Sequence, residues 1–192
     1  IGSLGTINNS DGDVDLTGEG EETFDACTLE FDFTAVSETI SFPYWFGSEE
    51  YPEWIESNFK DKMAIFISGG EFTDTVNIAT LSDGTPIGVE TVNQDINDGE
   101  NFRWNDYRAL PQYDGFTTEL EAVAENLTIG ETYHIKIVIA DIGDAAYDSG
   151  LFIKANINVN DLDLVVSNDV EINEGESTQL SAEVLNTTAN VE

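Results

Sequence analysis

The sequence has very little positive charge. Only 6 lysines and arginines stand against 39 aspartates and glutamates, and the formal net charge is −33. Binding to nucleic acid depends on clustered lysines and arginines that neutralise phosphates, and anionic membrane surfaces attract the same basic clusters. The sequence therefore excludes nucleic acid as an expected partner and disfavours an anionic membrane surface.

Cysteine and histidine are also scarce, with one of each. Cys27 alone cannot form a disulfide within the chain, and one cysteine with one histidine does not make a zinc-binding pattern. We interpret Cys27 as a buried, inert thiol. His134 shares a strand face with Lys136 and Val138, so we interpret it as a structural or partly exposed side chain rather than a catalytic base.

Long apolar runs are absent as well. No run approaches the roughly 20 apolar residues that a bilayer-spanning helix needs, so we expect no direct insertion into a membrane. The excess of acid leaves two interpretations open, solubility in a salty habitat or the binding of hard divalent cations by some of the carboxylates. A concentration of acids in loops would favour the second.

The sequence is rich in strand patterns. With 40% hydrophobic and 10% aromatic residues, this acidic chain is able to build a core. Residues 29–33 and 116–124 alternate between apolar and polar, and residues 63–67 and 133–139 are apolar on both faces. We therefore predict an all-β fold, mainly an antiparallel β-sandwich of jelly-roll type, with long acidic loops and one or two short helices near Trp54.

The pattern changes near residue 158. We predict that residues 1–158 form a β-sandwich ligand-binding domain, and that residues 159–192 form a linker and the first strands of a truncated immunoglobulin-like module. Part of the second segment could equally complete an edge of the main domain. Since there is neither an initiator methionine nor a signal peptide, we expect a piece of a larger protein, with this domain as a monomeric module in a tandem array.

An acidic stretch near the N-terminus is similar to a calcium-binding loop. Asp11, Asp13 and Asp15 occupy alternate positions, and Glu22 stands at the twelfth place counted from Asp11. The match is imperfect, because Leu16 stands where the helix-flanked version of that loop needs glycine.

A second acidic stretch, residues 139–152, lies between two apolar runs and reads as a loop between strands. It contains Asp141, Asp144 and Asp148. Aspartates this close in sequence repel one another. Either water and salt around an open loop or a bound cation must offset the repulsion.

The long irregular stretch 93–112 is the third candidate. It contains arginines beside aromatic side chains, and long irregular loops in compact domains are usually functional or mobile. We interpret it as one wall of a ligand site, with packing over a sheet edge as the open alternative. The predicted ligand-binding residues, with one tyrosine from the aspartate loop, are Arg103, Trp104, Tyr107, Arg108 and Tyr147.

Several segments occur in a fixed order along the chain: Leu29-Glu30-Phe31-Asp32-Phe33, Gly47-Ser48-Glu49-Glu50-Tyr51-Pro52-Glu53, Tyr113-Asp114-Gly115-Phe116-Thr117, Tyr133-His134-Ile135-Lys136, and Ile139-Ala140-Asp141-Ile142-Gly143-Asp144 through Tyr147-Asp148-Ser149. Over roughly residues 2–155 this order resembles the choice-of-anchor L domain of bacterial secreted and surface proteins. One departure lies at residues 59–62, where the family usually shows Phe-Asn-Asp. Asp61 keeps the acidic position there, while Lys60 replaces the amide.

The resemblance implies an extracellular location on the bacterial surface, within a large anchored protein. The chain is also similar to the peptide-binding modules of long calcium-dependent adhesins. The carboxylates that coincide with the family motifs come from separate loops and strand ends, as a calcium site of about six to eight oxygens requires, and calcium suits such a set better than magnesium. The expected metal ligands are Glu30, Asp32, Glu49, Glu50, Asp61, Asp114, Asp141, Asp144 and Asp148.

We therefore hypothesise a calcium-dependent adhesion module that is not an enzyme. Its expected partner is an external peptide, bound for example through its C-terminal carboxylate, or a glycan on another cell. One alternative is a structural spacer that calcium rigidifies. The other is a glycoside hydrolase that uses a pair of acids such as Glu49 with Glu50 or Asp144 with Asp148.

Overall fold

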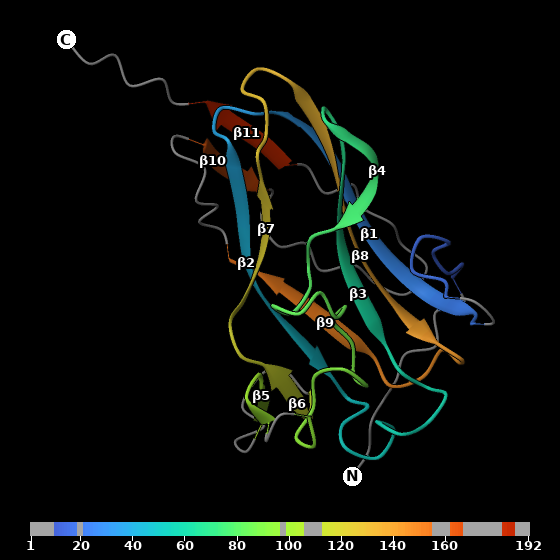
Figure 1. Ribbon diagram of the computed structural model, residues 1–192. Coiled ribbons are helices and arrows are strands. Elements are labelled where there is room, and N and C mark those ends of the chain that lie inside the picture. The colour runs from blue at the N-terminus through green and yellow to red at the C-terminus, as the bar shows by residue number, and fades with distance from the viewer. Residues whose placement is uncertain are drawn as a thin grey trace.

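The computed structural model describes residues 10–18, 21–96, 99–105, 113–154, 162–166 and 182–186. These residues form antiparallel sheets, two of which make up the main body (Figure 1). The four-stranded sheet has the order β1 (Thr23–Thr34), β8 (Thr132–Ile142), β3 (Lys62–Gly69) and β4 (Phe72–Asn77). The five-stranded sheet has the order β5 (Phe102–Trp104), β6 (Gly115–Thr117), β2 (Thr39–Ser48) and β7 (Leu120–Glu125), with β9 (Ser149–Ile153) paired to β2.

The hydrophobic core lies between these two sheets. Phe42, Tyr44 and Phe46 alternate along β2 and are fully buried, and they belong to the same core cluster as Ile65 of β3 and Ile135 of β8. Alternate residues of a strand point to opposite faces, so each strand gives every second side chain to this core. The prediction of an all-β sandwich is confirmed.

The outer face of the four-stranded sheet is partly covered by the N-terminal loop. Leu16 is buried there against Ala64 and Val138, which explains why β3 and β8 are apolar on both faces. The ammonium of Lys136 contacts Asp13 at 2.7 Å and Asp15 at 2.5 Å. Lys136 thus supplies, in this acidic stretch, the positive charge that a bound ion supplies in a calcium-binding loop.

Some predictions for single segments are wrong. The described residues contain no α-helix, and the segment near Trp54 forms successive turns, in which Trp54 N–H donates to the Glu50 carbonyl and Ser57 N–H to the Trp54 carbonyl. Trp54 packs on Phe59 and Tyr147, so side-chain contacts rather than a helical period shape this segment. Cys27 is exposed rather than buried; it lies on the edge strand β1, just after a register shift.

Beyond the main body, β10 (Leu162–Val166) pairs with β11 (Ala182–Asn186) in a separate two-stranded antiparallel sheet. The division of the chain near residue 158 stays a prediction. Among the described residues, no helix has the length and apolar character to cross a membrane.

Replacing Ile65 with alanine tests the position of the core. Ile65 is 0% exposed, and its truncation should lower the free energy of unfolding by about 2–5 kcal/mol because a cavity is left behind. Urea unfolding followed by tryptophan fluorescence measures the change. Val76→Ala on β4, where the side chain is 40% exposed, is the control and should cost less than about 1 kcal/mol. Equal losses in the two variants would contradict this core.

Candidate metal site

Strand ends bring acidic side chains together at one end of the sandwich. β3 begins at Lys62, which pairs with Ala140 near the end of β8. Asp61, immediately before β3, therefore lies beside Asp141. The chain that leaves β2 after Ser48 enters the same end, because β9 pairs with the last residues of β2 directly after the aspartate loop.

Glu50 is the acid with the most unfavourable surroundings. It is 1% exposed, and its Oε2 has no hydrogen-bond partner within the described part of the chain. Burial raises the pKa of Glu50 to about 8, and the negative charges of Asp144 and Asp141 add to this rise. Ionising a buried carboxyl beside other acids is costly unless a positive charge joins them.

Asp61 and Asp141 share these surroundings. Asp61 is 1% exposed, and burial together with the charge of Asp141 raises its pKa well above the ordinary value, although the Ser149 hydroxyl donates to its Oδ2 at 2.5 Å. Asp141 is 7% exposed, and burial, followed by the charge of Asp148, raises its pKa to about 7. We refer to Glu50, Asp61 and Asp141 as the buried acid group.

The buried acid group has no salt bridge among the described residues. The lysines on either side of Asp61 are paired elsewhere, Lys60 with Glu90 and Lys62 with Glu21 at 2.5 Å. Within the described part of the chain, no cation is therefore paired with the carboxyls that are buried most deeply.

Four further predicted ligands, Glu49, Asp114, Asp144 and Asp148, lie around the buried acid group. The negative charge of Asp144 raises the pKa of Glu50, and those of Asp148 and Asp144 raise the pKa of Asp141. The N–H of Glu49 donates to the Asp148 carbonyl at 3.2 Å, and the N–H of Asp114 donates to the carbonyl of the last residue of β2 at 3.1 Å. Burial and the charges of Asp148 and Glu49 raise the pKa of Tyr113, so this ring lies at the same end.

Two predicted metal ligands, Glu30 and Asp32, are not brought to this end. Both are exposed on β1, where Glu30 pairs with Lys136 and Asp32 pairs with His134. His134 Nδ1 lies 2.8 Å from Asp32 Oδ1, in agreement with a partly exposed, structural histidine. Asp141 follows His134 by 141 − 134 = 7 residues on β8, which separates the two positions by about 23 Å.

The predicted ligand-binding residues are partly accounted for. On β5, Arg103 donates to the carbonyl of Phe102 at 2.5 Å, and Trp104 is 44% exposed beside the Phe102 ring. Tyr147 packs on Trp54 with ring centroids 5.8 Å apart. Tyr107 and Arg108 lie outside the described residues.

Two loops carry the acids, and they pack against each other. The turn segment 51–59 separates Glu50 from Asp61, while the loop 143–148 follows Asp141. Gly143 has a φ of 90°, and a Cβ there would lie 2.6 Å from the carbonyl oxygen of Asn58. Tyr147, with a φ of 71°, places its ring on Trp54. Such backbone strain in a non-glycine residue is often found at functional sites.

The sequence patterns assigned no role to Asp25, nor to Ser149, which they included only as the end of a family motif. Asp25 adds negative charge to the surroundings of Asp141, and Ser149 donates to Asp61. Asp25 lies in the irregular part of β1, where the register with β8 shifts. Their positions beside Asp141 and Asp61 become apparent only from the strand pairing of the folded chain.

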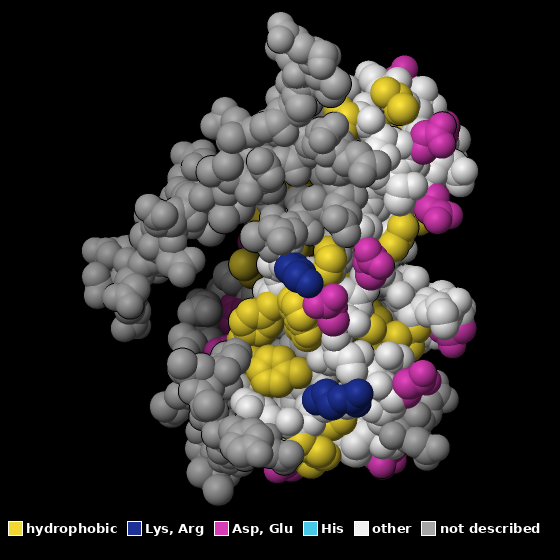
Figure 2. All heavy atoms as spheres, turned by 90° about the vertical axis from the view of Figure 1, so that its left-hand side faces the viewer, with side chains coloured by type: hydrophobic (Ala, Val, Ile, Leu, Met, Phe, Trp, Pro, Cys, Tyr) yellow, Lys and Arg dark blue, Asp and Glu magenta, His cyan; other side chains and the backbone are white. Residues whose placement is uncertain are grey.

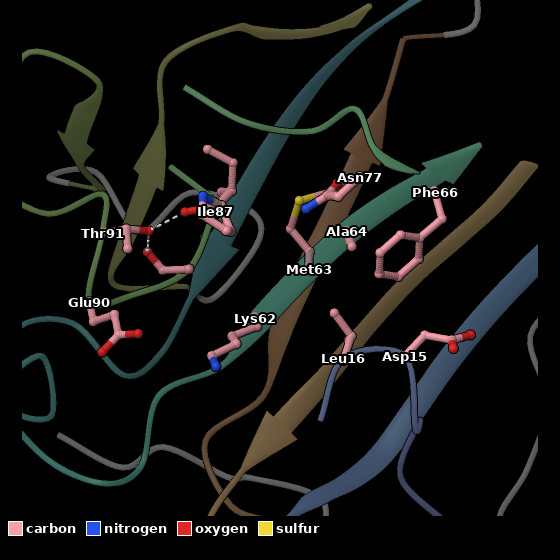
Figure 3. Close-up of a pocket in the computed structure, with 12 residues that line it drawn as sticks. Asp15, Leu16, Lys62, Met63, Ala64, Phe66, Asn77, Ile87, Glu90 and Thr91 are labelled. Atoms are coloured by element: carbon pink, nitrogen blue, oxygen red, sulfur yellow. Dashed lines mark hydrogen bonds between the residues drawn. The ribbon is translucent and has the colours of Figure 1, made fainter. Parts of the chain in front are cut away.

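Hollows formed by described residues also lie outside the buried acid group. A polar hollow of about 620 Å³ adjoins it and is lined by Glu21, Glu22, Asn58, Lys60, Ile142 and Gly143. A more apolar groove of about 330 Å³ lies on β3 beside Leu16 (Figure 3). Asp15 of the N-terminal acidic stretch lines it, but none of the nine expected metal ligands does. In that groove the Thr91 hydroxyl donates to the carbonyls of Pro86 and Gly88, which ties the adjacent loop together.

The model of the choice-of-anchor L domain matches residues 2–157. The chain belongs to this family. The choice-of-anchor L domain occurs in bacterial secreted or cell-surface proteins and is not an enzyme family. No curated protein and no solved structure matches this choice-of-anchor L chain significantly.

The pKa shifts predict how stability depends on pH when a chelator is present. The pKa of Glu50 is about 8 and that of Asp141 about 7 in the folded protein, above the values of about 4 in an unfolded chain. The folded state therefore holds more protons, and its stability should fall as pH rises from about 5 to 8. Urea unfolding at several pH values measures this slope, and Glu50→Gln should reduce it. Stability that rises over this range in the wild-type protein would contradict the prediction.

Proposed function

We propose that this domain is a calcium-dependent ligand-binding module that serves adhesion in a large bacterial surface protein. The observation that carries the proposal is the Glu50 carboxyl, which is 1% exposed, has an unpartnered Oε2 and lies near Asp141 and Asp144. A cation is the group that would satisfy this oxygen and neutralise its neighbours together.

Calcium fits the available ligands better than other common ions. The ligands are carboxylate oxygens, which hard cations prefer, and one cysteine with one histidine gives no set of soft ligands. Calcium accepts irregular arrangements of oxygen at about 2.3–2.6 Å, whereas magnesium demands an octahedron. These properties support calcium at the buried acid group, with Asp144 and Asp148, whose charges act on Glu50 and Asp141, and Glu49 as candidate further ligands.

The side chains would have to close around the ion. Within the described residues, no three acidic, histidine or cysteine side chains already converge on one point as metal ligands. Mutual repulsion keeps unneutralised carboxylates apart, and an ion removes that repulsion. Metal binding would therefore be coupled to the ordering of the loops 51–59 and 143–148.

A bound calcium ion would also change which ligands this chain accepts. A protein with a net charge of −33 repels anions at long range. An ion with an open coordination position reverses the local field and accepts a carboxylate, such as a peptide C-terminus, or two neighbouring sugar hydroxyls. Trp104 pairs with Gly115, which pairs with Ser48, so Trp104 lies about 10 Å from the end of β2, within reach of such a ligand.

The two alternative functions receive less support. A glycoside hydrolase needs both carboxyls of its pair to reach the substrate, and Glu50 is 1% exposed. A calcium-rigidified spacer would use the same ion but no external ligand. The spacer is the second candidate, because the buried acid group alone accounts for it.

Calcium should stabilise the protein through Glu50. At a calcium concentration about a hundredfold above the Kd, the Tm should rise by about 5–10 °C, since the ion binds the folded state alone. Glu50→Gln should lose most of this rise, because it removes a charged ligand. Glu53→Gln, at an exposed position three residues away, is the matched control and should keep it. If chelator and calcium leave the Tm of the wild-type protein unchanged, the proposal is wrong.

Ligand capture separates adhesion from the spacer. Peptides with a free C-terminus, the same peptides with an amidated C-terminus, and glycans should be screened with calcium and with chelator. Calcium-dependent binding that Asp141→Asn abolishes supports the adhesion module. Complete absence of binding, with calcium-dependent melting intact, would favour the spacer.

A further inference from the structure

The outer face of the five-stranded sheet carries a separate group of aromatic side chains. Trp45 of β2 and Phe152 of β9 are register partners, and both project away from the core because their neighbours along each strand point inward. Phe116 of β6 pairs with Gly47 on the same face, and Tyr113 precedes it. We refer to Trp45, Tyr113, Phe116 and Phe152 as the outer aromatic face.

Beneath part of the outer aromatic face, the sheet consists of glycines. Gly47 and Gly150 are register partners, and a Cβ on Gly47 would lie 3.0 Å from the Tyr113 ring. A Cβ on Gly150 would lie 2.3 Å from the Tyr113 hydroxyl oxygen. The Tyr113 ring thus lies directly against a strip of sheet without side chains, and a side chain at either glycine would displace it.

The rings hold one another in fixed positions. Tyr113 contacts Phe116 edge to face at 5.8 Å and Phe152 at 6.0 Å, and Phe116 and Phe152 are 6.1 Å apart. Because the rings are already packed, a ligand that binds there orders few side chains, which lowers the entropic cost of binding.

The outer aromatic face is open and bordered by polar groups. Phe152 is 38% exposed, and the other rings are partly exposed. Arg103 pairs with Phe116 across the sheet and is exposed. Lys154 lies 3.4 Å from Glu119, and both side chains are about half exposed. Figure 2 shows apolar side chains gathered on this side of the molecule, with basic and acidic side chains at their margin.

This combination suits one class of ligand. An apolar ring surface bordered by donors and acceptors matches a pyranose, whose C–H face is apolar and whose rim carries hydroxyls. The net charge of −33 repels polyanions but does not act on a neutral molecule. We propose that the outer aromatic face binds a neutral glycan through its sugar rings and without a metal ion. This site uses none of the three carboxyls of the buried acid group, although its Tyr113 lies near Asp148 and Glu49.

The experiment titrates the whole chain with neutral oligosaccharides of glucose, mannose and xylose in the presence of EDTA. Isothermal calorimetry should detect binding that calcium does not change. Phe152→Ala should weaken it by about fivefold, which corresponds to the loss of about 1 kcal/mol of stacking on one ring. Phe152→Leu should weaken it to a similar degree while it keeps the apolar bulk, so loss of folding would not explain the result.

Two controls separate this site from the calcium site. Phe66→Ala removes a partly buried ring on the outer face of the other sheet and should leave binding unchanged. Asp141→Asn should also leave it unchanged, even where calcium-dependent binding is lost. Binding that disappears with EDTA, binding that survives both Phe152 variants, binding of acidic glycans alone, or no binding of any neutral oligosaccharide would overturn the proposal.

Discussion

The burial of three carboxyls at one end of the sandwich is the constraint on which the rest of this structure depends. Glu50, Asp61 and Asp141 are each less than a tenth exposed, and no described salt bridge neutralises them. Each buried ion that lacks a partner costs several kcal/mol. The folded chain must therefore keep these carboxyls protonated or take up a cation, and either choice makes its stability depend on the solution around it.

The sandwich places the acids by strand register, and the loops hold them by mutual packing. Pairing of Lys62 with Ala140 sets Asp61 beside Asp141. The Tyr147 ring on Trp54 joins the loop 143–148 to the turn segment 51–59. The rigid core supplies a fixed frame for both loops. The outer aromatic face lies on the opposite side of the five-stranded sheet from the core, so it can serve a ligand without disturbing this frame.

Alternation of apolar residues was sufficient to predict the all-β sandwich, because a half-buried strand leaves a period of two in the sequence. Glu50, Asp61 and Asp141 were among the nine carboxylates that the family motifs indicated, but the sequence did not distinguish them from the other six. Glu30 and Asp32 could not be separated from them, because only the register shows that these strand residues face His134 and Lys136. Asp25 and Ser149 were missed for the same reason.

A crystal structure grown with calcium and analysed by anomalous scattering tests the central claim most directly. The account predicts an ion about 2.3–2.6 Å from carboxylate oxygens of Glu50, Asp61 and Asp141, with the loops 51–59 and 143–148 drawn closer to it than in the metal-free protein. An ion at this position with a coordination site open to solvent would further favour ligand capture. Crystals saturated with calcium in which these three carboxyls have no ion between them would contradict the account.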